Sequence, residues 1–298
     1  MPDAGRQRRS SCSPVSRALF AGAAVLAGLG LVIYPFIADL FYEYRTEGVI
    51  SALDEAADGQ SGEECFEVML AQADEYNREL REEYYLEPDL AVPEAKLPGG
   101  ETEYQSLLSF DETGIMGYVS IPCIDVNLPV YHGADDAVLK KGAGHLFGTS
   151  LPVGGRGTHA VITAHTGFGK ARFFTDLTEL RKGDCFVITV PGRRLLYCID
   201  RITVVSPEDT SPLTIEEGKD YCTLLTCTPY GINSHRLLVR GERVEEPDVS
   251  EDDIPEENKR GVFESEWVRR YLFSLLTACT AMTGAAAVIT VIRRMSRA

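Results

Sequence analysis

The 298-residue chain has too little positive charge for a nucleic-acid-binding protein. It contains 29 Lys and Arg residues against 45 Asp and Glu residues, for a formal net charge of -16 at pH 7. A phosphate backbone needs basic patches on its partner, and an acidic surface repels it. A disordered protein is also excluded, because 44% of the residues are hydrophobic and 9% are aromatic. We therefore expect a folded protein that binds no nucleic acid.

The eight cysteines and five histidines form neither a zinc-type nor a dithiol-type pattern. The sequence has no CxxC motif, which disfavours a thioredoxin-like redox couple, and no Cys/His group has the spacing of zinc ligands. It also has no internal repeat and no low-complexity tract. We therefore expect no metal and no other cofactor.

Basic residues concentrate at the two ends, where each cluster flanks a long apolar segment. Residues 18–41 contain a single charge, Asp39, near their far end, and residues 271–292 contain none. As helices, 18–38 and 271–292 would each be a little over 30 Å long, roughly the thickness of the hydrocarbon core. We expect an uncleaved signal-anchor over 18–41, with a cleaved signal peptide as the alternative. A buried core helix is the alternative for the second segment.

The arginine clusters predict the orientation of these two segments. Arg6, Arg8, Arg9 and Arg17 precede the first segment, and three arginines follow the second. Positive flanks normally stay inside the cell, so both termini are expected in the cytoplasm and the acidic middle of the chain outside. Arg269 and Arg270 compete at the second segment. Membrane lipid is then a partner of both ends.

The amino-acid composition changes twice along the middle of the chain. Residues 42–86 are charged and rich in Ala, Glu and Leu, which favours helix, and 87–100 carry the Pro and Gly residues of an irregular connector. From about residue 114, short β-branched runs alternate with turns, which indicates a mainly antiparallel barrel or sandwich. The expected strands are 117–122, 126–131, 159–163, 185–190, 195–205, 221–226 and 236–240. Short helices are expected at 136–140 and 172–180.

A predicted hairpin places one pair of cysteines opposite each other. A turn at Pro191-Gly192 sets Cys185 opposite Cys198, where the Cβ atoms of a cross-strand pair lie about 5 Å apart. This distance is slightly long for a disulfide but closable at a non-hydrogen-bonded pair. The register leaves two options: a disulfide, or two half-buried thiols.

A second hairpin brings a thiol next to a cation. An apolar strand stops at Cys227, because Pro229 cannot donate to a ladder, and the next strand begins near Arg236. In a hairpin these two residues face each other, and a guanidinium favours a thiolate and can stabilise an oxyanion. His165 also ends an apolar strand and could transfer protons. Taken singly, each of the three is more often a structural residue.

The motif around Cys227 resembles a known family. Residues 223–227, TLLTC, fit the TLxTC signature of sortases, and TLLTCTPYGINSHRLLVRG over 223–241 is similar to the extended signature of class C, the pilin-polymerising sortases. Residues 117–122, 128–133 and 144–155 resemble other blocks of that class. A second apolar segment after the domain is a further class C trait.

The resemblance implies a closed eight-stranded β-barrel with short helices, an N-terminal helical or lid segment and a membrane helix at each end. It implies Cys227 as nucleophile, His165 as acid/base partner and Arg236 as the cation that supports the oxyanion, with Thr226 and Thr228 at the substrate. His132, His145 and His235 are expected to be structural, and Arg240 is expected to be a charge on a strand face.

The implied domain organisation has six parts. They are a cytoplasmic tail (1–17), a signal-anchor (18–41), a helical and lid segment (42–103), a catalytic domain (104–244), an acidic tether (245–268), and a C-terminal membrane helix with a basic tail (269–298).

Two departures from the class C pattern stand out. The family often has His-Arg-Gly where this chain has His165-Thr166-Gly167. Its lid usually carries Asp-Pro-aromatic, whereas the nearest match here is Glu87-Pro88-Asp89, so residues 87–100 are either a lid anchored by Glu87 and Pro88 or a plain linker.

The implied reaction is cleavage of an LPxTG-like sorting signal through a Cys227 thioester, followed by transfer to a lysine of the next pilin. The alternatives are a housekeeping sortase that anchors surface proteins to a cell-wall peptide, an assembly module without activity, and, less favoured, a thiol protease.

Overall fold

The computed structural model describes residues 14–57, 60–86, 100–110, 113–166 and 172–244, and short helical pieces between 272 and 295. The lid candidates Glu87 and Pro88 and the acidic tether 245–268 lie outside the described residues, as does most of the apolar segment 271–292.

Eight strands close into a barrel, which confirms the expected mainly β fold. Their order around the barrel is β1-β2-β3-β4-β7-β8-β6-β5. All neighbouring pairs are antiparallel except β2–β3 and β4–β7, which are parallel. The strands are β1 (Ile115–Ile121), β2 (Val126–His132), β3 (Ala143–His145), β4 (Thr158–Thr163), β5 (Cys185–Val190), β6 (Arg193–Val205), β7 (Asp220–Thr228) and β8 (His235–Arg243).

Every second side chain along the strands points into the barrel, and these side chains fill its interior. Ile162 on β4, Leu224 on β7 and Val239 on β8 are fully buried in one apolar cluster together with Phe186 on β5. Successive side chains of a strand point to opposite faces, so the residues between these positions lie on the outer face of the barrel. Strand β1 is buried at all seven positions, because helices cover its outer face as well.

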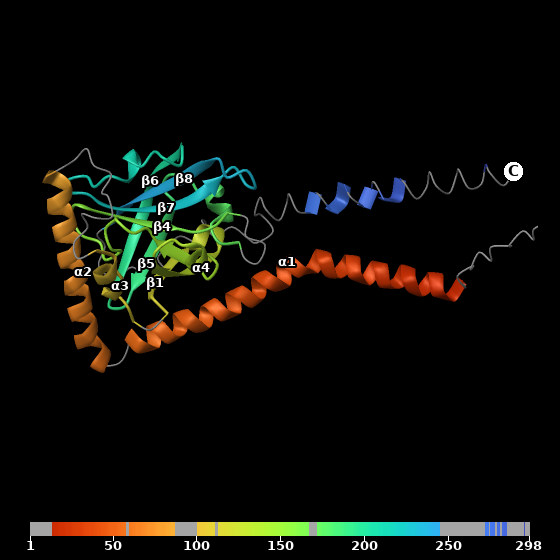
Figure 1. Ribbon diagram of the computed structural model, residues 1–298, viewed down its shortest axis with the longest axis horizontal. Coiled ribbons are helices and arrows are strands. Elements are labelled where there is room, and N and C mark those ends of the chain that lie inside the picture. Colours follow the sequence, from red (N-terminus) through yellow and green to blue (C-terminus); the bar gives the residue numbers. More distant parts are fainter. Residues whose placement is uncertain are drawn as a thin grey trace, which may run out of the picture.

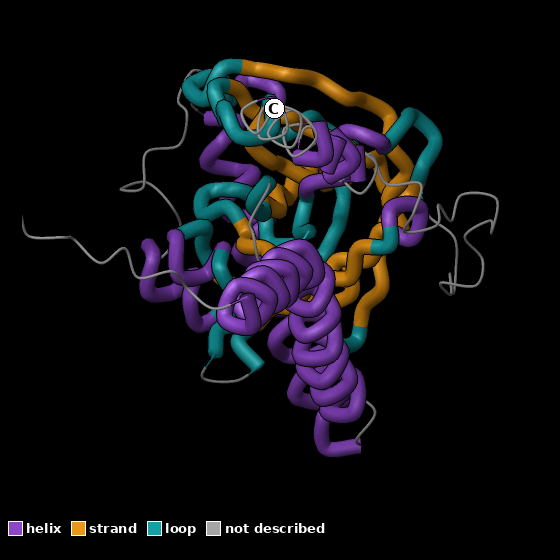
Figure 2. The backbone as a smooth tube through the Cα atoms, turned by 90° about the vertical axis from the view of Figure 1, so that its right-hand side faces the viewer, coloured by secondary structure: helices purple, strands orange, loops and turns teal. Residues whose placement is uncertain are grey.

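The helices pack outside the barrel, as Figures 1 and 2 show. Near the N-terminus lie α1 (Pro14–Ala57), α2 (Gln60–Leu86) and α3 (Gly100–Ser106). Within the barrel sequence are α4 (Asp136–Leu139) and the 3-10 turns η2 (Pro122–Ile124), η3 (Thr175–Glu179) and η4 (Ser211–Leu213). The expected helix at 136–140 is confirmed, and the one expected at 172–180 is the shorter turn η3.

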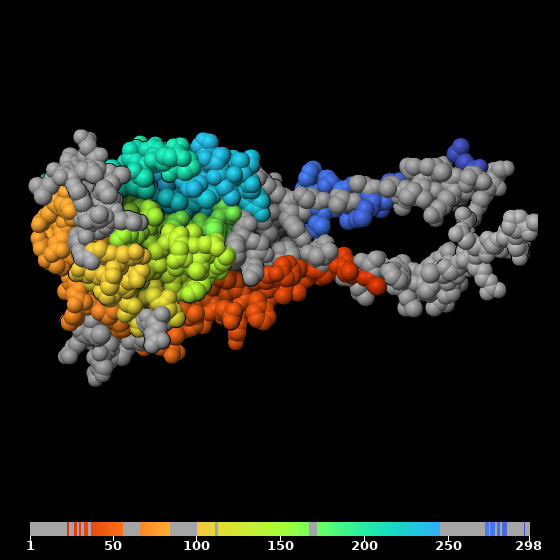
Figure 3. Space-filling view, in the orientation of Figure 1, coloured from red at the N-terminus to blue at the C-terminus, as the bar shows by residue number. Residues whose placement is uncertain are grey.

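Helix α1 is one continuous element of 44 residues. The apolar segment 18–41 and the charged segment that follows therefore belong to the same helix. Its second half lies along the barrel domain, and Ile50 and Leu53 pack against Ile115, Tyr118 and Tyr131 (Figure 3). Among the residues that the structure describes, no helix is both long enough and apolar enough to span a membrane.

The described helical pieces near the C-terminus lie on the same side of the barrel as the N-terminal half of α1 (Figures 1 and 2).

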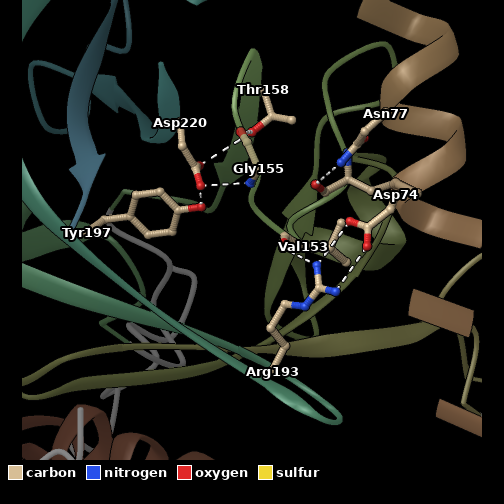
Figure 4. Close-up of polar contacts among 9 residues, drawn as sticks. Asp74, Asn77, Val153, Gly155, Thr158, Arg193, Tyr197 and Asp220 are labelled. Atoms are coloured by element: carbon tan, nitrogen blue, oxygen red, sulfur yellow. Dashed lines mark hydrogen bonds and ion pairs between the residues drawn. The ribbon is translucent and has the colours of Figure 1, made fainter. Parts of the chain in front are cut away.

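Helix α2 is fixed to the barrel by polar contacts, those of Asn77 buried and the pair of Arg193 with Asp74 partly exposed (Figure 4). The Asn77 side chain donates to the backbone oxygen of Leu151 at 3.0 Å and accepts from its backbone nitrogen at 2.7 Å. Arg193 at the start of β6 donates to both carboxylate oxygens of Asp74 at 3.0 Å and to the Val153 backbone oxygen at 2.8 Å. These contacts hold the loop before β4, at the end of the barrel where β7 begins.

Candidate active site

Three of the predicted site residues lie in one row across neighbouring strands. The parallel register of β4 and β7 pairs Thr163 with Leu225, a constant offset of 62 residues that brings His165 level with Cys227. The antiparallel register of β7 and β8 pairs Cys227 directly with Arg236, as the hairpin predicted. The fold therefore places an imidazole, a thiol and a guanidinium side by side at one end of the barrel.

Cys227 on β7 and Arg236 on β8 belong to the outer face of the barrel, and His165 follows just beyond the end of β4 with its Nε2 atom buried. Leu224 and Leu237 are buried in the interior cluster, and Cys227 and Arg236 are each an odd number of residues away from them on the same strands. Cys227 and Arg236 are half-buried. A substrate approaching this face can reach the thiol without entering the barrel.

Hydrogen bonds of threonine hydroxyl groups connect the ends of strands β4 and β7. The Thr226 hydroxyl donates to the backbone oxygen of Ala164 at 2.7 Å and shares a hydrogen bond with the Thr166 hydroxyl at 2.5 Å. Thr226 is 1% exposed, so this side chain links the nucleophile strand to the histidine strand. Because its hydroxyl is already bonded and turned away from the outer face, Thr226 does not fit the expected substrate contact. Thr228 is half-buried and remains open to that role.

The Arg236 guanidinium contacts only backbone oxygens of its own loop in the described part of the chain. Its Nη1 donates to the backbone oxygens of His235 and Asn233 at 3.1 and 3.3 Å. No carboxylate among the described residues forms a salt bridge with it. Its charge is therefore free to act on a negative group of a substrate.

The loop between β7 and β8 gives the site an apolar rim. Tyr230 and Ile232 are 51% and 72% exposed, next to the Cys227–Arg236 pair. Asp136 at the start of α4 lies within electrostatic range of His165: the pKa of Asp136 is lowered mainly by its hydrogen bond to Lys140 and, to a smaller degree, by His165.

A second polar row lies on the same outer face, nearer the other end of the barrel. His159 Nδ1 donates to the Thr214 backbone oxygen at 2.8 Å, and its Nε2 accepts from the Thr223 hydroxyl at 2.7 Å. Burial lowers the pKa of His159 to about 4, so the ring is neutral at pH 7. This row fixes the loop between β6 and β7 to the barrel.

Arg240 lies on the outer face of β8, as the sequence indicated, and is held there by ion pairs. It is paired with Asp200 and Glu216 at 2.5 and 2.9 Å, and its guanidinium lies 3.9 Å from the ring centroid of Tyr221. Its side chain is 11% exposed, because the loop between β6 and β7 covers it through Glu216. Arg240 therefore holds that loop.

Two of the three remaining histidines, His145 and His132, hold parts of the fold. His145 is fully buried, donates from Nε2 to the Ser150 backbone oxygen at 2.8 Å and accepts at Nδ1 from the Tyr104 hydroxyl at 2.9 Å. His132 contacts the backbone oxygens of Gly114 and Leu107 at 2.9 and 2.6 Å. His235 is exposed.

The hairpin of β5 and β6 carries a disulfide. Cys185 pairs with Cys198 in the ladder, and the two sulfurs are bonded. Of the two options that the sequence left open, the structure has the disulfide. Among the described residues, no group of three or more His, Cys, Asp or Glu side chains is arranged to hold a metal ion.

Comparison with known proteins identifies the family to which the fold belongs. The family model described as the sortase domain matches residues 119–244. Sortase C1 from Streptococcus agalactiae is 37% identical, with a TM-score of 0.59, over 67% of this chain and 100% of that structure. Sortase C from Streptococcus pneumoniae is 41% identical, with a TM-score of 0.58, over 68% of this chain and 100% of that structure.

Curated relatives are matched over a smaller share. Sortase A from Bacillus anthracis is 30% identical over 46% of this chain and 63% of its own length. Sortase A from Streptococcus agalactiae is 30% identical over 43% of this chain and 52% of its own length. The match thus spans about half to two thirds of these relatives. The barrel, the TLxTC strand and the solved structures agree, and the chain belongs to the sortase family, with sortase C enzymes among its structural neighbours.

Proposed function

We propose that this protein is a cysteine transpeptidase that cleaves an LPxTG-like sorting signal and joins the resulting acyl group to an amine. The observation that carries the proposal is the row of His165, Cys227 and Arg236 on adjacent strands of a sortase barrel. A thiol beside a guanidinium and an imidazole has the three groups that acyl transfer through a thioester requires.

In the first half-reaction the Cys227 thiol gives its proton to His165, and its sulfur attacks the carbonyl carbon of the Thr in the sorting signal. Arg236 donates to the developing oxyanion, since its guanidinium is not held by a carboxylate of the described chain. The C–N bond to Gly breaks, and His165 gives its proton to the departing Gly amine. The products are a Cys227 thioester and a free C-terminal fragment.

In the second half-reaction a lysine amine attacks the thioester carbon. His165 takes the proton of the incoming amine, the C–S bond breaks, and an isopeptide bond links the two subunits. His165 then returns this proton to the Cys227 sulfur, which regenerates the thiol, so no redox cofactor is consumed. Thr228 and the exposed Tyr230 and Ile232 lie beside the row and provide contacts for the apolar part of the signal.

Pilin subunits are the substrate class that we propose. Support comes from the sortase C neighbours: one, from Clostridium perfringens, was solved with the C-terminal cell wall sorting motif, and another concerns pilin substrate specificity in Streptococcus pneumoniae. The rival is a housekeeping sortase that attaches surface proteins to a cell-wall peptide amine.

We also propose that the protein is anchored in the cell membrane by both ends, with the barrel outside the cell. The support is the apolar character of 18–41 and 271–292 with their arginine flanks, and the shared side of the barrel on which the N-terminal half of α1 and the C-terminal pieces lie. The acidic segment 245–268 would then be a tether. If its deletion, with both anchors kept, leaves product formation unchanged, the tether role is excluded.

Mixing the purified protein with pilin subunits that carry a sorting signal tests the function. Ladders of covalent multimers are expected from the wild type and none from Cys227→Ala. Attachment of single subunits to a cell-wall peptide amine, without ladders, would favour the housekeeping reaction. Ladders formed by Cys227→Ala would leave the protein as an assembly module.

A further inference from the structure

Arg172, seven residues after His165, contacts the first helix at a point distant in sequence. Arg172 donates from its backbone nitrogen to Oδ1 of Asp39 at 3.1 Å and from Nε to Oδ2 of the same carboxylate at 3.0 Å. Its side chain is only 9% exposed. One carboxylate on α1 thus fixes both the main chain and the side chain of a residue 133 positions away.

A second contact lies one helical turn further along α1. The ring of Tyr42 packs edge to face on Phe173, with the centroids 5.0 Å apart and the planes at 70°. Its hydroxyl donates to the Lys141 backbone oxygen at 2.8 Å. Phe173 is buried and has a φ of 42°, in the left-handed region that aromatic residues seldom adopt. Such a conformation persists only where packing enforces it, and Tyr42 contributes to that packing.

The same short segment holds the histidine. The backbone nitrogen of Phe174 donates to the backbone oxygen of His165 at 3.1 Å, and Thr166 and Phe173 form an antiparallel bridge. Residues 172–174 therefore touch α1 on one side and the catalytic strand end on the other. A shift of this segment changes where the His165 backbone sits.

The charges around Arg172 make Asp39 the critical partner. Glu43 and Asp125 approach Nη2 at 3.4 Å and Asp176 approaches Nη1 at 4.0 Å, all more distant than Asp39. Although burial lowers it, these carboxylates together raise the pKa of Arg172, with Asp39 as the strongest. The guanidinium therefore stays charged, and Asp39 alone bonds both its side chain and its main chain.

We propose that Asp39 and Tyr42 on α1 are positioning residues for His165. The inference rests on the proposed transpeptidase function, in which His165 transfers the protons. Neither residue touches the reacting atoms, and both act through residues 172–174. Because α1 also carries the apolar segment 18–41, this contact joins the proposed membrane anchor to the catalytic centre.

The test compares two variants of the full-length protein in detergent micelles. In Asp39→Asn, one of the two carboxylate oxygens that accept hydrogen bonds from Arg172 is replaced by an amino group, which cannot accept one. Glu43→Gln is the matched control, since it removes the same charge one turn away and loses only a 3.4 Å contact. We expect Asp39→Asn to lower kcat about tenfold with KM within twofold, as misplacement of a catalytic group does. Glu43→Gln is expected to stay within twofold in both.

A second readout needs no substrate. In protein labelled at histidine Cε1, the His165 signal, assigned with His165→Gln, should shift in Asp39→Asn and not in Glu43→Gln. If Asp39→Asn does not fold, Tyr42→Leu tests the same segment with the same expected shift. An unmoved His165 signal, or an unchanged kcat with a lowered Tm, would overturn the positioning role. A wild type without activity would contradict only the proposed function, because the spectroscopic comparison would still decide this inference.

Discussion

The Thr226 hydroxyl donates to the backbone oxygen of Ala164 at 2.7 Å, and both residues immediately precede the groups proposed to react. Ala164 is followed by His165 and Thr226 by Cys227. Together with the backbone bond from Ala164 to Leu225, this hydrogen bond limits how far the histidine strand can move from the nucleophile strand.

Replacement of Thr226 by Val should reduce both stability and turnover. The shape is kept, but the buried Ala164 oxygen loses a donor, which costs about 1–3 kcal/mol in unfolding free energy. We expect kcat to fall more than KM rises, because the strand ends separate while the substrate face is unchanged. Urea unfolding and peptide-cleavage kinetics measure the two effects. Thr226→Ser, which keeps the hydroxyl, is the control, and equal behaviour of the two variants would refute the role of this bond.

Arg236 should be sensitive even to conservative replacement. Arg236→Lys keeps the charge but has no planar fork of donors, so support of the oxyanion weakens. Loss of one oxyanion donor commonly lowers kcat about 10²–10³-fold. We expect Arg236→Ala in that range and Arg236→Lys between it and the wild type, measured as the rate of thioester formation. Arg193→Lys, at the end of the barrel where β7 begins, controls for loss of an arginine as such. A rate in Arg236→Ala equal to that of the wild type would exclude the proposed role.

Removal of the disulfide should destabilise the barrel without altering the site. Cys185 and Cys198 are 13 residues apart, and closing a loop of that size contributes about 3 kcal/mol in the chain-entropy model. The double variant Cys185→Ser/Cys198→Ser should unfold at lower urea and should not respond to dithiothreitol, whereas the wild type should respond. Equal urea midpoints for the oxidised wild type and the double variant would show that the bridge adds nothing.

The buried histidines predict an acid-sensitive fold. Burial lowers the pKa of both His145 and His159 to about 4 from the ordinary 6.5. A histidine with a depressed pKa gives stability that is complete above pH about 6.5 and is lost as the pH falls towards 4, because the unfolded chain binds the proton first. For each of the two rings, the free energy of unfolding should therefore fall by about 1.4 kcal/mol per pH unit within this pH range.

Urea unfolding at pH 7, 6 and 5 measures this slope. His145→Asn should be less stable at pH 7 but should lose less stability on acidification than the wild type. His235→Asn is the matched control, because that side chain is exposed and holds no buried contact. An acid slope in His145→Asn as steep as in the wild type would contradict the assignment.

The local sequence pattern was sufficient to predict the register of the two hairpins. Gly192 adopts the positive φ that its turn needs, at 78°, and the ladder then follows the register that pairs Cys185 with Cys198. The Cys227–Arg236 pair follows in the same way from Pro229 and Gly231. Tight turns fix register, and register fixes which side chains meet.

Residues that are close in the fold but distant in sequence could not be predicted from local pattern. Strand β3 has only three residues, including a glycine, and gives no alternating pattern. The parallel pairing of β4 with β7 joins segments 62 residues apart, so the place of His165 beside Cys227 came from family resemblance rather than from spacing. The partner of Arg172 had one sequence signal: Asp39 is the only charge in an otherwise apolar segment.

The mass of the intact protein after mixing with a sorting-signal peptide tests the central claim most directly. We expect an adduct equal to the peptide up to its Thr, labile to hydroxylamine, present in the wild type and absent in Cys227→Ala. Cleavage of the peptide without such an adduct, or an adduct that persists in Cys227→Ala, would contradict nucleophilic catalysis by Cys227.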